Sequence, residues 1–274
     1  MTLRLKILIG ILIGLTLAHG LLLITKIKND ILTNKEIMTM ETQSRFKILE
    51  DEIGNLNKQI TNLPEKIKYE KTKLEYKLQQ ATVIIYNKTN SAVGSGVTIK
   101  YKGQFYILSA GHMVESLEDV LAFGENGQEI GEVEIIKWDF TMVEENIDGN
   151  SDFTKATDLI LLRPKNKNLI PRVYIELADF EPQSPTEVYI VGNPAGIEDV
   201  VSEGRVIRYM NNFMYITDNI YYGSSGGGVF NLSGKLIGIV SHMYPISSNP
   251  LVLPYMTYGI VRLNIIKQFL GDIK

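Results

Sequence analysis

The side chains with clear catalytic potential in this sequence are two histidines and the serines of one glycine-rich segment. A serine hydroxyl becomes a nucleophile only when a neighbouring base takes its proton and a carboxylate orients that base. Beyond residue 81 the chain contains two histidines, His112 and His242, so a serine hydrolase here must use one of them. The chain has no cysteine, which excludes a cysteine nucleophile, a disulfide and a thiolate metal site.

Two candidate catalytic groups, a histidine and an aspartate, stand beside apolar runs that are typical of strands. His112 follows the run 106–108 and a turn of small residues, and Asp158 directly precedes the run 159–162. Ser225 lies in the glycine-rich segment 223–228, where tight turns let the amides of Gly223 and Ser225 converge on one oxyanion. Ser224 is expected to be a loop residue, and Asp152 is the alternative carboxylate.

The order histidine, aspartate, serine is that of chymotrypsin-type enzymes, whereas α/β-hydrolases carry serine, acid and then histidine. The segment 223–227 also fits the loose G-x-S-x-G pattern of an α/β-hydrolase elbow. That interpretation fails because no acidic residue lies between Ser225 and His242 and no helix pattern follows Ser225.

Four segments resemble trypsin-like serine proteases of the chymotrypsin fold, and more closely their HtrA-like branch. The likeness covers about residues 81–271. Its segments are 94–97 with 107–114 around the histidine, 158–162 at the aspartate, 223–227 with 236–241 at the serine, and the loop Val191-Gly192-Asn193-Pro194-Ala195-Gly196. Gly111 and Gly228 depart from the family, which usually has alanine and proline there, but both are small. We expect no PDZ domain and no cleavage-dependent activation.

The resemblance implies a serine endopeptidase with a catalytic triad in a cleft between two antiparallel β-barrels. Ser225 would attack the peptide carbonyl, His112 would transfer the proton and Asp158 would orient His112, with the amides of Gly223 and Ser225 as the oxyanion hole. No cofactor or metal is implied. The expected primary pocket has a neutral floor that favours an uncharged side chain, or a basic one if Asp218 forms the floor instead. Its residues are Asn219, Ser241, His242 and Met243.

The elements that must position these groups are short strands. Eleven β-type runs separated by turn residues predict an all-β sandwich or barrel over residues 81–274, followed by a helix over 264–270. The runs are 82–86, 96–100, 105–109, 132–138, 159–162, 187–191, 204–209, 214–217, 228–231, 236–241 and 258–262.

The N-terminal residues 1–28 carry an uncharged apolar run over 7–24, which is long enough to span a bilayer. The run continues past the small residues at 18–20, so we expect an uncleaved signal anchor with His19 neutral inside it. Basic residues flank both ends, so the charges leave orientation undecided. The analogy with the HtrA-like branch places the protease domain outside the cytoplasm.

Residues 29–80 are polar and helical in character, with apolar side chains at the spacing of a coiled-coil seam. One interpretation is a stalk that forms a homo-oligomer; the other is an amphipathic helix that folds back on its own domain. Pro64 predicts a kink or a restart of this helix.

The charge is unevenly distributed along the chain. Residues 1–80 carry 13 basic and 9 acidic side chains, and residues 81–274 carry 15 and 22. The acidic balance of the second part argues against nucleic acid as its partner and leaves a protein or peptide substrate. The acidic segment 144–152 lacks the glycine and glutamate positions of an EF-hand and predicts a solvated loop.

Two other functions fit the same pattern of residues. One is an inactive, protease-shaped module that binds peptides in a membrane assembly, which an intact set of three catalytic residues disfavours. The other is a protease dedicated to one partner or polyprotein, for example in a virus or mobile element. Composition does not separate housekeeping from dedicated proteolysis.

Overall fold

The computed structural model describes residues 3–33, 40–114, 120–124, 127–141, 156–169, 173–218, 220–245, 256–271 and 273. The chain divides into two compact units, Met1–Lys73 and Leu74–Lys274. The boundary falls inside a helix, so the last residues of that helix belong to the second unit. The predicted boundaries at residues 28 and 80 stay predictions.

The first unit contains helix α1 (Leu3–Thr33) and most of helix α2 (Met40–Gln80). Within α1, the segment Ile7–Lys28 is long and apolar enough to cross a membrane. Helix α2 continues through Pro64, so the alternative of a restart there is wrong. Proline removes one backbone hydrogen bond from a helix, and the hydrogen bonds of the other turns keep this 41-residue helix continuous. The coiled-coil pairing of α2 stays a prediction.

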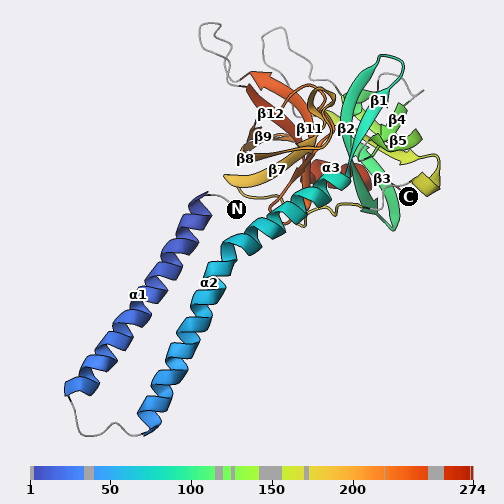
Figure 1. Cartoon of the computed structure of the whole chain (residues 1–274). Helices are drawn as coiled ribbons and strands as arrows, with labels where there is room; N and C mark the ends of the chain where they lie inside the picture. Colours follow the sequence, from blue (N-terminus) through green and yellow to red (C-terminus); the bar gives the residue numbers. More distant parts are fainter. Residues whose placement is uncertain are drawn as a thin grey trace. The chain divides into compact units, whose positions relative to one another are not determined.

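The second unit is built from two closed β-barrels whose neighbouring strands pair antiparallel, and this confirms the predicted fold class (Figure 1). The first barrel has the order β1-β2-β3-β6-β5-β4 and the second has the order β10-β11-β12-β9-β8-β7. Helix α3 (Leu263–Gly271) follows the last strand. The strands are β1 (Thr82–Asn87), β2 (Ala92–Tyr101), β3 (Gln104–Ser109), β4 (Val120–Phe123), β5 (Glu129–Thr141), β6 (Thr157–Pro164), β7 (Thr186–Gly192), β8 (Val200–Met210), β9 (Phe213–Thr217), β10 (Gly228–Phe230), β11 (Leu236–Pro245) and β12 (Met256–Arg262).

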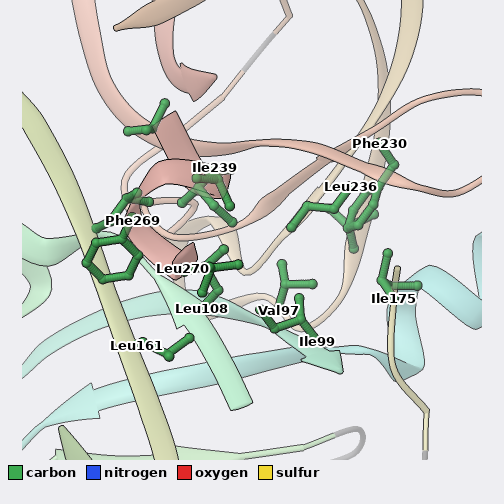
Figure 2. Packing of buried hydrophobic residues seen from close by; sticks show 14 of the residues in the cluster. Val97, Ile99, Leu108, Leu161, Ile175, Phe230, Leu236, Ile239, Phe269 and Leu270 are labelled. Carbon is green, nitrogen blue, oxygen red and sulfur yellow. The ribbon is translucent and has the colours of Figure 1, made fainter. Parts of the chain in front are cut away.

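One apolar cluster joins the two barrels to each other and to both neighbouring helices. It includes Val97 and Leu108 of the first barrel, Ile239 of the second barrel, and Leu270 of α3, all fully buried (Figure 2). Each barrel also has an interior cluster of its own. Because the shared cluster lies between the barrels, it fixes their relative position, and the loops at their junction are held in place with them.

Helix α2 contributes its last turns to this shared cluster. Leu78 is fully buried there, and Leu74 packs against the same residues. A Cβ atom added to Gly234, in the turn before β11, would lie 2.4 Å from a methyl carbon of Leu74. The end of α2 is therefore part of the barrel unit.

Replacing Leu78 with alanine is expected to destabilise the barrel unit by about 2–5 kcal/mol, because the change leaves a cavity in a close-packed core. Urea unfolding of the full chain in detergent, followed by the fluorescence of the single tryptophan, measures this effect. Lys77→Ala alters the exposed neighbouring side chain and is the matched control. An unchanged unfolding free energy in Leu78→Ala would contradict the packing of α2 in this core.

Candidate active site

His112 lies in a short 3-10 turn, Gly111–Met113, which begins one residue after strand β3 ends. The turn is supported from β5, because the Trp138 indole Nε1 donates a hydrogen bond to the Gly111 carbonyl at 3.0 Å. The His112 side chain is 33% exposed, so part of its ring is accessible to solvent. The centroid of the Phe140 ring lies 6.3 Å from the centroid of the His112 ring.

Asp158 is the second residue of β6, and its carboxylate holds both the backbone and the ring of His112. Its Oδ1 atom accepts the His112 amide at 2.8 Å, and its Oδ2 atom lies 2.8 Å from His112 Nδ1. The Ser241 hydroxyl donates a third hydrogen bond to Oδ2 at 2.5 Å. With its side chain only 7% exposed, this carboxylate is satisfied by three protein donors and fixes the position of the imidazole.

The two side chains shift each other's pKa toward the ion pair. Burial alone would lower the pKa of His112, but the hydrogen bond and the charge of Asp158 outweigh it and raise that pKa above 6.5. Burial alone would raise the pKa of Asp158, but the hydrogen bonds and charge of His112 and the hydrogen bond from Ser241 lower it below 3.8. Asp158 is therefore ionised wherever His112 titrates.

The glycine-rich segment 223–228, which carries Ser225, approaches His112 from the second barrel. The Ser95 amide donates to the Ser225 carbonyl at 2.7 Å, and the Gly226 amide donates to the Val240 carbonyl at 2.8 Å. A Cβ atom added to Gly226 would lie 3.0 Å from the amide nitrogen of Ala110, two residues before His112. These contacts bring Ser225 to the same junction as His112 and Asp158.

The amides of Gly223 and Ser225 have no acceptor within the described part of the chain, in contrast to the amides of Ser224, Gly226 and Gly227 around them. Two unoccupied donors on one glycine-rich turn are what an oxyanion site requires. Ser225 is half-buried, whereas Ser224 is 5% exposed. The Ser225 hydroxyl and the His112 ring, both described, are not hydrogen-bonded in this structure.

Two of the predicted pocket residues line a cavity of about 270 Å³ beside the histidine and aspartate. The His242 ring packs edge-on against Phe213, with ring centroids 4.7 Å apart, and its Nδ1 atom lies 3.1 Å from the Ser241 hydroxyl. Asn219 lies outside the described residues, as do Asp152 and the segment 144–152, and the side chain of Met243 is not described. The predicted pocket therefore stays a prediction. The cavity is lined by His112, Phe140, Thr141, Ala156, Thr157, Asp158, Phe213, Ser241 and His242.

The hydroxyl of Ser241 has a role that sequence reasoning did not assign. Besides lining the cavity, the Ser241 side chain binds the carboxylate of Asp158 through its hydroxyl, from a position 83 residues away. Trp138 was likewise not expected at the turn of His112. Neither residue carries a sequence signal for its contact, because both contacts form only when strands from distant segments pack together.

The two departures from the family pattern have local explanations. A Cβ atom at Gly111 would lie 3.1 Å from backbone atoms of Leu159, so the turn approaches β6 closely. A side chain at Gly228 would collide with the Phe230 ring, whose nearest atom would be 2.2 Å away. In this chain the space next to position 228 is filled by an aromatic ring.

Residues 94–239 match the family described as trypsin-like peptidase domain. The chain belongs to this family. Its HtrA-like resemblance is confirmed by two relatives, a probable periplasmic DegP-like serine endoprotease of Halomonas elongata and the serine endoprotease DegS of Haemophilus influenzae. The Halomonas protein is 27% identical over 68% of this chain and 37% of its own length. The Haemophilus protein is 24% identical over 58% of this chain and 48% of its own length. The chain thus spans less than half of either relative.

Solved structures support the fold of this trypsin-like domain. The active form of the Rv3671c protease from M. tuberculosis superposes with a TM-score of 0.56 at 14% identity, over 73% of this chain and 83% of that one. A serine endoprotease from Yersinia pestis superposes with a TM-score of 0.52 at 21% identity, over 72% of this chain and 67% of that one. At these identities the likeness concerns the fold of the two barrels.

Proposed function

We propose that this protein is a membrane-tethered serine endopeptidase that uses Ser225, His112 and Asp158. The observation that carries the proposal is the His112 ring bound at Nδ1 by a buried carboxylate, at the same junction as a turn with two unoccupied amides. Family membership and relatives named serine endoproteases support it. The substrate is an extended segment of a protein or peptide.

In the proposed reaction, the Ser225 hydroxyl oxygen attacks the carbonyl carbon of the substrate while His112 Nε2 takes the hydroxyl proton. Asp158 keeps Nδ1 protonated, so Nε2 carries the lone pair that accepts this proton. The amides of Gly223 and Ser225 donate to the carbonyl oxygen as it becomes an oxyanion, and loss of one such donor costs about 10²–10³ in kcat.

The tetrahedral intermediate collapses when His112 gives its proton to the leaving nitrogen and the peptide C–N bond breaks. Water then attacks the ester formed on Ser225, His112 again serves as base, and the carboxylic acid product leaves with the serine hydroxyl restored. The hydrogen bond between Ser225 and His112 forms when substrate is bound, since catalytic contacts in free enzymes are often long.

Cleavage of a protein or peptide library by the full chain in detergent tests this function. We expect cleavage products that carry new amino termini and that disappear in Ser225→Ala. Unchanged cleavage in Ser225→Ala would overturn the assignment of the nucleophile. Binding of peptides without any cleavage would support a peptide-binding module instead.

The membrane tether is part of the proposal, with α1 as the span and α2 as a stalk that holds copies of the chain together. The apolar segment Ile7–Lys28 supports it, and the DegP-like relative carries the word periplasmic in its name. Because the chain lacks cysteine, a single Lys88→Cys change in an exposed position gives a clean label. Labelling in intact cells by a membrane-impermeant maleimide is expected; labelling only after lysis would place the barrels in the cytoplasm.

The proposed base predicts a loss of activity in acid. His112 must be neutral to accept the serine proton, and its pKa is raised by Asp158, so kcat/KM falls as the pH drops through a value above 6.5. Asp158 stays ionised in that range because its own pKa is lowered. Measurement of kcat/KM between about pH 5 and pH 9 gives this apparent pKa. An acidic limb below 6.5 would contradict the pairing of His112 with a charged Asp158.

A further inference from the structure

The turn that follows strand β7 makes direct contact with the candidate oxyanion hole. The Ala195 amide donates a hydrogen bond to the Tyr222 carbonyl at 2.6 Å. The carbonyl and the amide of a trans peptide point in opposite directions, so this bond turns the Gly223 amide away from Ala195. Glycine admits either orientation of the peptide before it, and Gly223 has a φ of +96°, so outside contacts must select one.

Asn193 holds this turn in shape from the interior of the protein. It is fully buried, and its Oδ1 atom accepts the Asp199 amide at 2.9 Å. Its Nδ2 group donates to the Val83 carbonyl at 3.2 Å, and its backbone amide donates to the Ser95 hydroxyl at 2.8 Å. Ala195 and Asp199 both have φ above +50°, so the turn keeps a conformation that L-residues rarely adopt.

Ser95 connects the turn 193–199 to the glycine-rich segment 223–228. Its hydroxyl accepts from the Asn193 amide and donates to the Gly223 carbonyl at 2.8 Å. Its own amide donates to the Ser225 carbonyl. The carbonyls of both residues whose amides form the candidate oxyanion hole are therefore bound by Ser95.

Helix α2 reaches this network through one side chain. The Gln79 amide Nε2 donates to the Asp199 carbonyl at 2.9 Å. The last turn of α2 is anchored by the buried side chain of Leu78, and the Thr82 hydroxyl caps the Leu78 carbonyl at 2.9 Å. A continuous set of hydrogen bonds thus runs from Gln79 through Asp199, Asn193 and Ser95 to Gly223.

We propose that Gln79 is a positioning residue through which the end of α2 sets the orientation of the Gly223 amide. The proposal rests on the proposed function, because an oxyanion hole matters only if Ser225 acts on a carbonyl. Without the hydrogen bond from Gln79 the turn 193–199 is held less firmly, and the Ala195 contact that orients the peptide between Tyr222 and Gly223 weakens with it. A change in the packing of the last turn of α2 is then transmitted to the Gly223 amide through this set of hydrogen bonds.

The test compares the full chain with Gln79→Met and Gln79→Glu, neither of which donates a hydrogen bond at neutral pH. Lys77→Met, on the exposed side of the same turn, is the matched control. Each protein is titrated with a fluorophosphonate so that rates refer to labelled active sites. A peptide substrate gives kcat and KM, and a peptidyl trifluoromethyl ketone, which forms a tetrahedral adduct with an oxyanion, is compared with the matching unreactive peptide.

We expect kcat per active site to fall about tenfold in both Gln79 variants, with KM and affinity for the unreactive peptide within about twofold of the parent. Affinity for the trifluoromethyl ketone should fall in parallel with kcat/KM, and Lys77→Met should match the parent. A purely structural role would lower the number of titratable sites and leave kcat per site unchanged, which would overturn the proposal. Absence of labelling in the parent chain would instead overturn the proposed function itself, so the two failures are distinguishable.

Discussion

Replacement of Asp158 by asparagine is expected to lower kcat/KM at neutral pH by about 10³–10⁴-fold. The Oδ1 position accepts the backbone amide of His112, so the carbonyl oxygen of the new amide stays there. The NH₂ group must then face Nδ1 of His112, where the carboxylate oxygen Oδ2 was. A donor at that position forces the imidazole proton onto Nε2, and the ring loses the lone pair that accepts the serine proton.

Steady-state kinetics with a peptide substrate measures this loss, with the unfolding free energy measured in parallel. Asp139→Asn removes an exposed carboxylate from the neighbouring strand β5 and is the matched control, expected to keep the activity of the parent. A loss of less than about tenfold in Asp158→Asn would show that His112 does not depend on this carboxylate for its tautomer.

Gly226→Ala is expected to destabilise the barrel unit by about 3 kcal/mol or more, or to prevent folding. Gly226 has a φ of +83°, and an added Cβ atom would lie 2.0 Å from the Ser95 carbonyl oxygen and 2.2 Å from the Ser109 hydroxyl. Those two oxygens are joined by a hydrogen bond of 2.6 Å, so the methyl group would enter a closed contact. The backbone there also carries the Ser225 carbonyl and cannot yield without disturbing the site.

Gly131→Ala separates the steric effect from the cost of the backbone conformation. Gly131 has a similar φ of +86°, but no atom lies within 4 Å of an added Cβ. We expect a loss of about 1 kcal/mol for this control, which is the cost of a left-handed conformation alone. Urea unfolding followed by tryptophan fluorescence compares the two variants, and equal losses would contradict the close contact at Gly226.

The sequence predicts the strands well where apolar runs alternate with turn residues, because that pattern reflects burial. The sequence does not predict strand β4, since Val120–Phe123 offers too few residues for a pattern. Strand β5 extends beyond the predicted run at both ends, to Glu129 and Thr141, because ladder hydrogen bonds depend on the backbone and not on apolar side chains.

The three candidate catalytic residues are predictable because the chemistry restricts their types and their order along the chain. The groups that support them are not, since a serine that binds a carboxylate resembles any other serine in sequence. Ser241, Ser95 and Gln79 acquire their contacts only after both barrels and the end of α2 have packed. A motif can point to such a region, as the segment 191–196 does, without indicating which atoms meet there.

Reaction of the full chain in detergent with a fluorophosphonate probe, read by intact mass, tests the central claim most directly. The proposed function predicts one adduct per chain, formed by the parent and by Ser224→Ala but lost in Ser225→Ala. Ser224 is the matched control because it adjoins Ser225 and differs in being buried. Equal labelling of Ser225→Ala and the parent, or no labelling of the folded parent chain, would contradict an activated Ser225.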